Sequence, residues 1–138
     1  MNANKETSKN DSLIYPELSY EIIGILYKVQ NELGNGYQEK HYQRAIEVEL
    51  GKKGIRFRRE LPVQITYDGS TIGKYFLDFL IEDKIILEIK VINNFRIADF
   101  KQISSYLRKM NLKLGILANF KTDRLTYKRI INTKAAEK

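Results

Sequence analysis

The 138-residue chain contains no cysteine and a single histidine. Without cysteine, disulfide frameworks, thiolate metal sites and thiol catalysis are excluded. The lone His41 also excludes a zinc site built from several histidines. The sequence has no apolar run long enough to span a bilayer and no signal-peptide core near its beginning. We therefore expect a cytoplasmic protein with no membrane partner.

Acidic residues are the minority among the charged ones. The chain has 24 Lys and Arg against 17 Asp and Glu, a formal net charge of +7, which favours a polyanionic partner. Its length suits one domain that can bury a core without disulfides or metals to stabilise it. We expect a disordered polar tail over residues 1–12, one domain over 13–132 and a frayed end over 133–138.

The centre of the sequence predicts an antiparallel hairpin. Two runs of β-branched and aromatic residues, 75–81 and 85–91, flank the polar residues 82–84. A three-residue loop is favoured, because a two-residue loop would set apolar against charged partners on both faces. The left-handed loop position would then fall to Asp83 or Lys84. The resulting pairs are Ile81 with Ile85, Phe79 with Leu87, and Leu77 with Ile89.

Three charges interrupt these apolar strands. The favoured register puts Asp78 directly opposite Glu88 on the other face, with Lys90 two residues along on the same side. Two adjacent carboxylates repel by about 4 kcal/mol at roughly 4 Å and a dielectric near 20. Lys90 offsets part of this repulsion, and a hard divalent cation would offset more. Two interpretations stay open here: a metal-dependent hydrolytic site, or an ion cluster that closes one end of a sheet.

Helical spacing of apolar residues predicts three helices, over 16–33, 37–50 and 97–110. Pro16 suits a first helical turn, and Gly34 is a natural stop. Alternation predicts a strand over 61–67, and further strands are expected over 112–118 and 127–131. Glu39, in the first turn of the second helix, lies on its inward face. That position fits either a role in the helix dipole or a functional one.

A basic stretch precedes the strand at 61–67. Its cationic residues interleave with Ile55 and Phe57, which indicates a strand entry with a polar side. The stretch is either a solvated edge that discourages aggregation or a rim that contacts phosphates. We favour the rim, because only Glu60 balances the positive charge. The candidate nucleic-acid-binding residues are Lys52, Lys53, Arg56, Arg58 and Arg59.

Asp78 on one strand, followed by Glu88-Ile89-Lys90 on the next, resembles the PD-(D/E)XK nuclease superfamily, over roughly residues 37–119. Residues 36–42 (GYQEKHY) also fit the signature of the GxxExxY protein family, and residues 102–106 (QISSY) resemble the superfamily's Q-x-x-x-Y motif. The resemblance implies an α/β (α+β) fold with a restriction-endonuclease-like core. Helices would flank a mixed central sheet in the order α-β-β-β-α-β, with an extra N-terminal helix.

The resemblance also implies a role for each site residue. Asp78, Glu88 and the Ile89 carbonyl would bind Mg²⁺ or Mn²⁺, and Glu39 would complete the metal site. Lys90 would orient or help deprotonate the attacking water and stabilise charge on the phosphate. Gln102 and Tyr106 would hold the third-strand carboxylate or a substrate phosphate, and Tyr42 is a further supporting residue.

The implied function is a Mg²⁺-dependent nuclease that acts on nucleic acid, with DNA favoured over RNA and the choice between them left open. The alternative is a catalytically inactive nucleic-acid-binding module with a nuclease-like fold, and a third option is a structural or regulatory partner protein. The chain could form a homodimer, and the helix over 16–33 is the expected interface.

Overall fold

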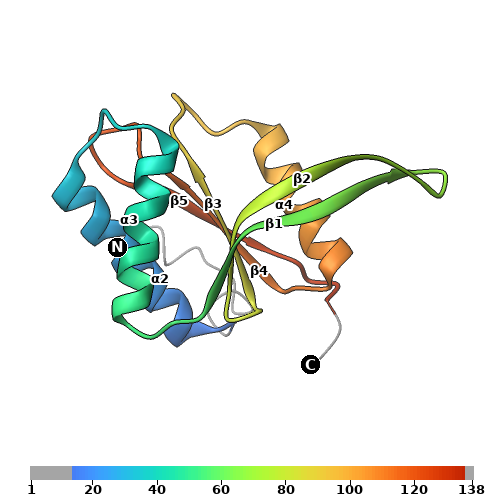
Figure 1. Ribbon diagram of the computed structural model, residues 1–138, viewed down its shortest axis with the longest axis horizontal. Coiled ribbons are helices and arrows are strands. Elements are labelled where there is room, and N and C mark those ends of the chain that lie inside the picture. The colour runs from blue at the N-terminus through green and yellow to red at the C-terminus, as the bar shows by residue number, and fades with distance from the viewer. Residues whose placement is uncertain (1–13, 136–138) are drawn as a thin grey trace.

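A computed structural model of the chain describes residues 14–135, so the tail expected over 1–12 lies outside the described residues. The described part contains one five-stranded sheet with spatial order β1-β2-β3-β4-β5 (Figure 1). Neighbouring strands run antiparallel, except that β3 and β4 are parallel. The elements are α2 (Pro16–Leu33), α3 (Glu39–Lys52), β1 (Phe57–Tyr67), β2 (Ser70–Ile81), β3 (Ile85–Lys90), α4 (Ile97–Met110), β4 (Leu114–Asn119) and β5 (Thr126–Ile131).

Helices cover both faces of the sheet. One buried cluster joins α2 and α3 to one face, and a second joins α4 to the other (Figure 1). This arrangement confirms the expected mixed sheet flanked by helices, with α2 as the extra N-terminal helix. Over residues 14–135, none of the helices combines the length and the apolar character that a membrane crossing requires.

The helix boundaries follow local signals. Both α2 and α4 have the predicted bounds, whereas α3 begins and ends two residues later than expected. Pro16 occupies the first turn of α2, and Gly34 ends that helix with φ of 71°. At the start of α4, the Asp99 carboxylate accepts a hydrogen bond from the Arg96 N–H at 2.9 Å. This bond satisfies one of the backbone groups that a helix start leaves unpaired.

The β2–β3 hairpin has the predicted register near its turn, with Ile81 opposite Ile85 and Phe79 opposite Leu87. Glu82 and Asp83 take the left-handed conformation, so of the two residues expected at that position, Asp83 and Lys84, it is Asp83 that adopts it. The predicted pairing of Leu77 with Ile89 is absent, because the ladder between β2 and β3 ends at Phe79.

The ladder ends there because β1 and β2 change faces together. Phe79 belongs to the cluster under α2 and α3, whereas Leu77 belongs to the cluster under α4. The prediction that Leu77 shares a face with Phe79 is therefore wrong. Opposite this point β1 contains Glu60, whose φ of 52° is left-handed. Beyond it, residues 61–77 form a ribbon, here called the arm, that projects past the helices (Figure 1).

Candidate functional site

Two carboxylates occupy the gap where β2 leaves β3. The Glu88 carboxylate accepts a hydrogen bond from the Asp78 N–H at 2.8 Å. The Asp78 carboxylate accepts one from the Ile89 N–H at 2.7 Å. Each acid therefore bonds to the backbone of the opposite strand and replaces a missing ladder bond. Where the ladder ends, the two predicted acids therefore lie together, each within one hydrogen bond of the opposite strand.

Burial disfavours the charged forms of both carboxylates. Glu88 is 2% exposed, and burial together with the nearby charge of Asp78 raises its pKa to about 7. Burial likewise raises the pKa of Asp78 to about 6, although the hydrogen bond from Ile89 acts in the opposite direction. Near neutral pH the pair either retains a proton or needs a cation beside it.

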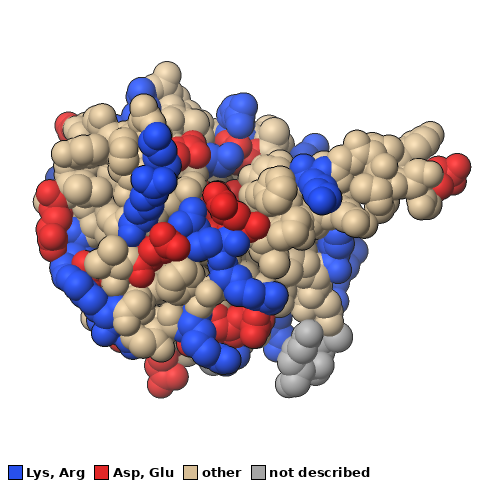
Figure 2. Space-filling model, viewed as in Figure 1, with Lys and Arg blue, Asp and Glu red and all other residues tan. Residues whose placement is uncertain are grey.

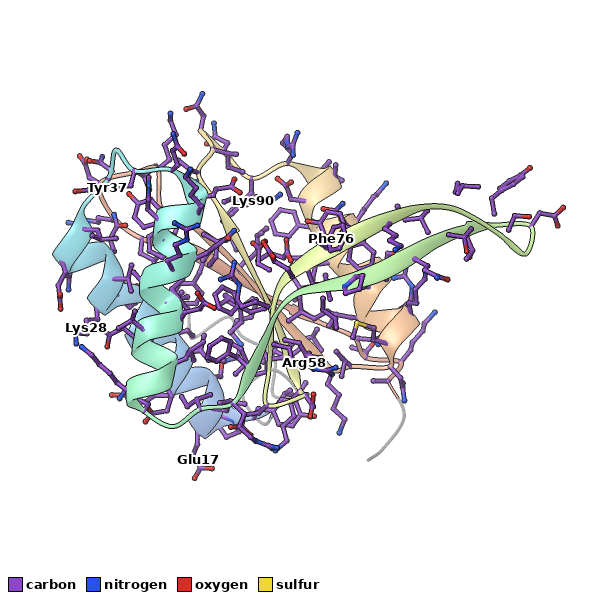
Figure 3. All side chains as sticks on the ribbon, in the orientation of Figure 1. Glu17, Lys28, Tyr37, Arg58, Phe76 and Lys90 are labelled. Carbon is purple, nitrogen blue, oxygen red and sulfur yellow. The ribbon has the colours of Figure 1, made fainter. Side chains whose placement is uncertain are left out.

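Lys90, at the end of β3, lies between acids from two elements. Its charge lowers the pKa of both Asp78 and Glu88, against the effect of burial. Its ammonium also lies 3.9 Å from the Asp99 carboxylate at the start of α4. Asp99 is 2% exposed and is held by the Arg96 guanidinium at 2.9 Å. Figure 3 shows Lys90 at the end of β3, near the middle of the molecule.

Helix α3 brings a third acid to this end of the sheet. Glu39 is its first residue, and the Glu39 carboxylate accepts a hydrogen bond from the Val91 N–H at 3.4 Å. The charge of Glu39 is one of the causes that raise the pKa of Asp78. The predicted residues Glu39, Asp78, Glu88 and Lys90 therefore lie in one region of the fold.

Tyr42 fixes the start of α3. Its side chain is fully buried, and its hydroxyl donates a hydrogen bond to the Gly34 carbonyl at 2.6 Å. Its ring stacks on Phe120 with centroids 4.5 Å apart. The Phe120 N–H in turn donates to the Lys90 carbonyl at 3.0 Å. Tyr42 thus links the loop before α3 to the strand end that carries Lys90.

The Tyr75 hydroxyl donates a hydrogen bond to the Glu88 carboxylate at 2.8 Å. Its ring stacks on Tyr106 of α4, with centroids 4.9 Å apart. Gln102 is a hydrogen-bond partner of Tyr106 and lowers its pKa, while burial has the larger, opposite effect. The sequence motif predicted that Gln102 and Tyr106 hold either Glu88 or a substrate phosphate. The direct hydrogen bond to Glu88 comes from Tyr75, and the role of Gln102 and Tyr106 toward a phosphate stays a prediction.

Every member of the basic stretch has an acidic partner. The expectation that only Glu60 balances this charge is therefore wrong. The ion pairs are Lys52 with Glu49 at 3.6 Å, Lys53 with Glu21 at 3.2 Å, Arg56 with Glu82 at 3.0 Å, Arg58 with Asp83 at 2.9 Å, and Arg59 with Glu47 at 3.1 Å.

Arg59 differs from the other four, which lie near the β2–β3 turn or the C-terminal end of α3. Its Nε donates to the Asp78 carbonyl at 2.9 Å, and its guanidinium lies 4.5 Å from the centroid of the Phe79 ring. A further bond at 2.7 Å joins it to Gln43 of α3. Arg59 therefore fixes the backbone of β2 at the position where the strand changes face.

The donor set suits a hard cation. Asp78, Glu88 and the Ile89 carbonyl offer oxygen atoms, which Mg²⁺ and Mn²⁺ prefer. Among residues 14–135, no three Asp, Glu or His side chains are grouped closely enough to hold a metal, so the fit depends on the two-carboxylate pair. Glu88 is buried and Asp78 is half-buried, and a divalent ion would supply positive charge that offsets the repulsion between their carboxylates.

Comparisons with known proteins place the chain in a family. No curated protein matches it. The solved structure titled "Crystal structure of SSO0001" is similar with a TM-score of 0.53 and 22% identity, which shows a shared fold. The match covers 86% of this chain and 59% of that one, so this chain spans less than two thirds of that protein. The profile of the PD-(D/E)XK nuclease superfamily matches residues 16–130. The chain therefore belongs to the PD-(D/E)XK nuclease superfamily.

Proposed function

We propose that the chain is a metal-dependent nuclease that hydrolyses phosphodiester bonds in DNA. Membership of the nuclease superfamily supports this class of reaction. The observation that carries the proposal is the pair of half-buried Asp78 and buried Glu88, each of whose carboxylates accepts a hydrogen bond from the backbone of the opposite strand in the gap between β2 and β3. Lys90 beside the pair supplies a cationic group that can stabilise charge on a phosphate.

In this proposal Asp78, Glu88 and the Ile89 carbonyl hold Mg²⁺ or Mn²⁺. A bound divalent ion would polarise a phosphoryl oxygen and lower the pKa of a nearby water. Glu39 contributes the third carboxylate from α3, close to the same strand end. Lys90 orients the attacking water and stabilises the charge that develops on the phosphate. Tyr75 holds Glu88 in place, which fixes one ligand before the ion binds.

We also infer that the chain is a GxxExxY-type member of the superfamily. Gly36 has φ of 101°, a value that favours glycine. Glu39 reaches the end of β3, and Tyr42 fixes the start of α3. The three signature positions thus have separate tasks: a turn, a proposed metal ligand and an anchor.

A cleavage assay tests the proposed activity. We expect the purified protein to cut DNA in Mg²⁺ or Mn²⁺, and we expect Asp78→Asn and Lys90→Ala to abolish the cutting. Lys28→Ala is a matched control, because Lys28 is an exposed lysine on α2. Cutting that persists in both site variants would point to a contaminant and contradict the proposal.

A non-cleaving nucleic-acid-binding module is the second candidate. It is favoured by the hydrogen bonds that the two carboxylates already make to each other's strands, without a third carboxylate in a close cluster. Calorimetry separates the two candidates. Uptake of Mn²⁺ supports the nuclease, whereas salt-sensitive DNA binding with no uptake supports the module.

A further inference from the structure

The arm has one face that the helices leave uncovered. Its other face packs on α4 through Val63 and Leu77, and Lys109 at the end of α4 donates to the Gln64 carbonyl at 2.6 Å. On the uncovered face, Ile72 is 65% exposed and Phe76 is 54% exposed. These two apolar side chains flank the exposed Lys74 on a face that no element among residues 14–135 covers, so the Phe76 ring is available to a partner.

This face approaches the proposed catalytic pair at Asp78, whereas Tyr75 on the opposite, α4-packed face donates to Glu88. Alternation along β2 places Ile72, Lys74 and Phe76 on the same side of the strand. Phe76 lies two residues before Asp78, and Figure 3 shows it on the arm close to the centre of the molecule. A strand that reaches Asp78 from the uncovered face, on the side away from α4, would pass beside the Phe76 ring.

The flanks of the catalytic pair are basic. Lys40 and Arg44 on α3 and Lys74 on the arm are exposed, and within residues 14–135 none of them has an ion pair. Figure 2 shows basic side chains over α3 and again where the arm leaves the body, with acidic side chains between them. Phosphates of one strand can contact the basic side chains on α3 and on the arm while the strand crosses the surface between them.

We propose that an unpaired nucleic-acid strand lies between α3 and the arm, with one base stacked on Phe76. The inference rests on the proposed function and specifies its substrate class. A base inside a duplex has both faces stacked against its neighbours, so only an unpaired base presents a free face to an exposed ring. Lys74 contacts a phosphate next to the stacked base, and Lys40 and Arg44 contact phosphates on the opposite side.

Fluorescence anisotropy in EDTA tests this inference, because it measures binding without metal or cleavage. The probes are a labelled single-stranded oligonucleotide and a duplex of the same sequence. We expect Phe76→Ala to weaken single-strand binding about tenfold and to leave duplex binding within about twofold. Phe76→Tyr keeps a ring and should restore the affinity. Tyr20→Ala is the matched control, since Tyr20 is an aromatic residue on α2 that is 78% exposed.

A second variant tests the electrostatic part. Lys74→Ala should weaken binding of the single strand and reduce its salt slope by about 0.7, the value for one lost phosphate contact. Unchanged single-strand affinity in Phe76→Ala would overturn the inference, as would an equal loss for strand and duplex. A dimer that dissociates in Phe76→Ala, with single-strand affinity unchanged, would assign the face to a second copy of the chain.

The binding result is separate from the proposed nuclease activity. Loss of stacking in Phe76→Ala can be observed even if the protein takes up no metal and cuts nothing. Conversely, cleavage that requires Asp78 but does not depend on Phe76 would leave the nuclease in place and remove the stacking platform.

Discussion

Replacing Glu88 with glutamine removes a charge from a buried site and keeps the shape of the side chain. The glutamine carbonyl can accept from the Asp78 N–H, and its amide group can donate to the Tyr75 hydroxyl oxygen, so both bonds to Glu88 have substitutes. The variant therefore isolates the electrostatic cost of the carboxylate. We expect Glu88→Gln to stabilise the metal-free protein above neutral pH.

The magnitude follows from the pKa of Glu88, which burial raises from 4.5 to about 7. Because the folded state binds this proton more tightly than the unfolded chain does, the proton stabilises the fold below about pH 4.5. That stabilisation is lost as the pH rises through the folded pKa near 7. At 1.36 kcal/mol per pH unit, the wild-type protein loses about 3 kcal/mol across this window.

Urea unfolding in EDTA between about pH 4 and pH 8 measures the effect. The free energy of unfolding of Glu88→Gln should match that of the wild type near pH 4 and exceed it by about 3 kcal/mol near pH 8. The variant should keep only the weaker pH dependence that comes from Asp78. Glu32→Gln, an exposed change on α2, should follow the wild type throughout. If wild type and Glu88→Gln lose stability in parallel, the proposed cost of the buried charge is wrong.

Three further outcomes follow from the same contacts. Asp99→Asn removes the acid 3.9 Å from the Lys90 ammonium and should slow cleavage about tenfold. Mn²⁺ uptake measured by calorimetry should not change. A loss of Mn²⁺ uptake that matches the loss of cleavage would contradict the idea that Asp99 acts through Lys90. Tyr42→Phe removes a 2.6 Å hydrogen bond and should cost about 1 kcal/mol in urea unfolding, so an unchanged midpoint would count against its anchoring role. Gly115→Ala places a Cβ 2.7 Å from the Ile103 Cγ2 and should destabilise by about 1–3 kcal/mol, whereas a stable variant would show that α4 can shift.

Local chemistry explains why the helices could be predicted. Pro16 and Gly34 mark the two ends of α2, and apolar spacing marks its buried side. The hairpin register near the turn was also predictable, because only one register keeps apolar residues opposite each other. These features depend on neighbours within a few residues of one another.

The change of face in β1 and β2 could not be predicted in this way. It coincides with a left-handed Glu60, a position where no glycine signals the conformation. The tertiary structure stabilises it through Arg59, which bonds to β2 and to α3. Simple alternation along β2 would put Leu77 on the same face as Phe79, and the prediction that assumed this alternation was wrong.

Contacts between distant segments account for the other differences. The acids that neutralise the basic stretch come from α2, α3 and the β2–β3 turn, so the stretch appears unbalanced only along the sequence. Tyr75 and Asp99 support Glu88 and Lys90 from other elements. For Asp99 the available signal was an acidic residue in the first turn of a helix, which usually indicates a cap.

Calorimetric titration of the protein with Mn²⁺ most directly tests whether Asp78 and Glu88 form a metal site. We expect the wild-type chain to bind the ion with measurable heat, and we expect Asp78→Asn and Glu88→Gln to lose that binding while remaining folded. The matched variant Glu32→Gln should bind as the wild type does. A wild-type chain that takes up no Mn²⁺, or uptake that survives in both site variants, would contradict the proposed metal-dependent chemistry.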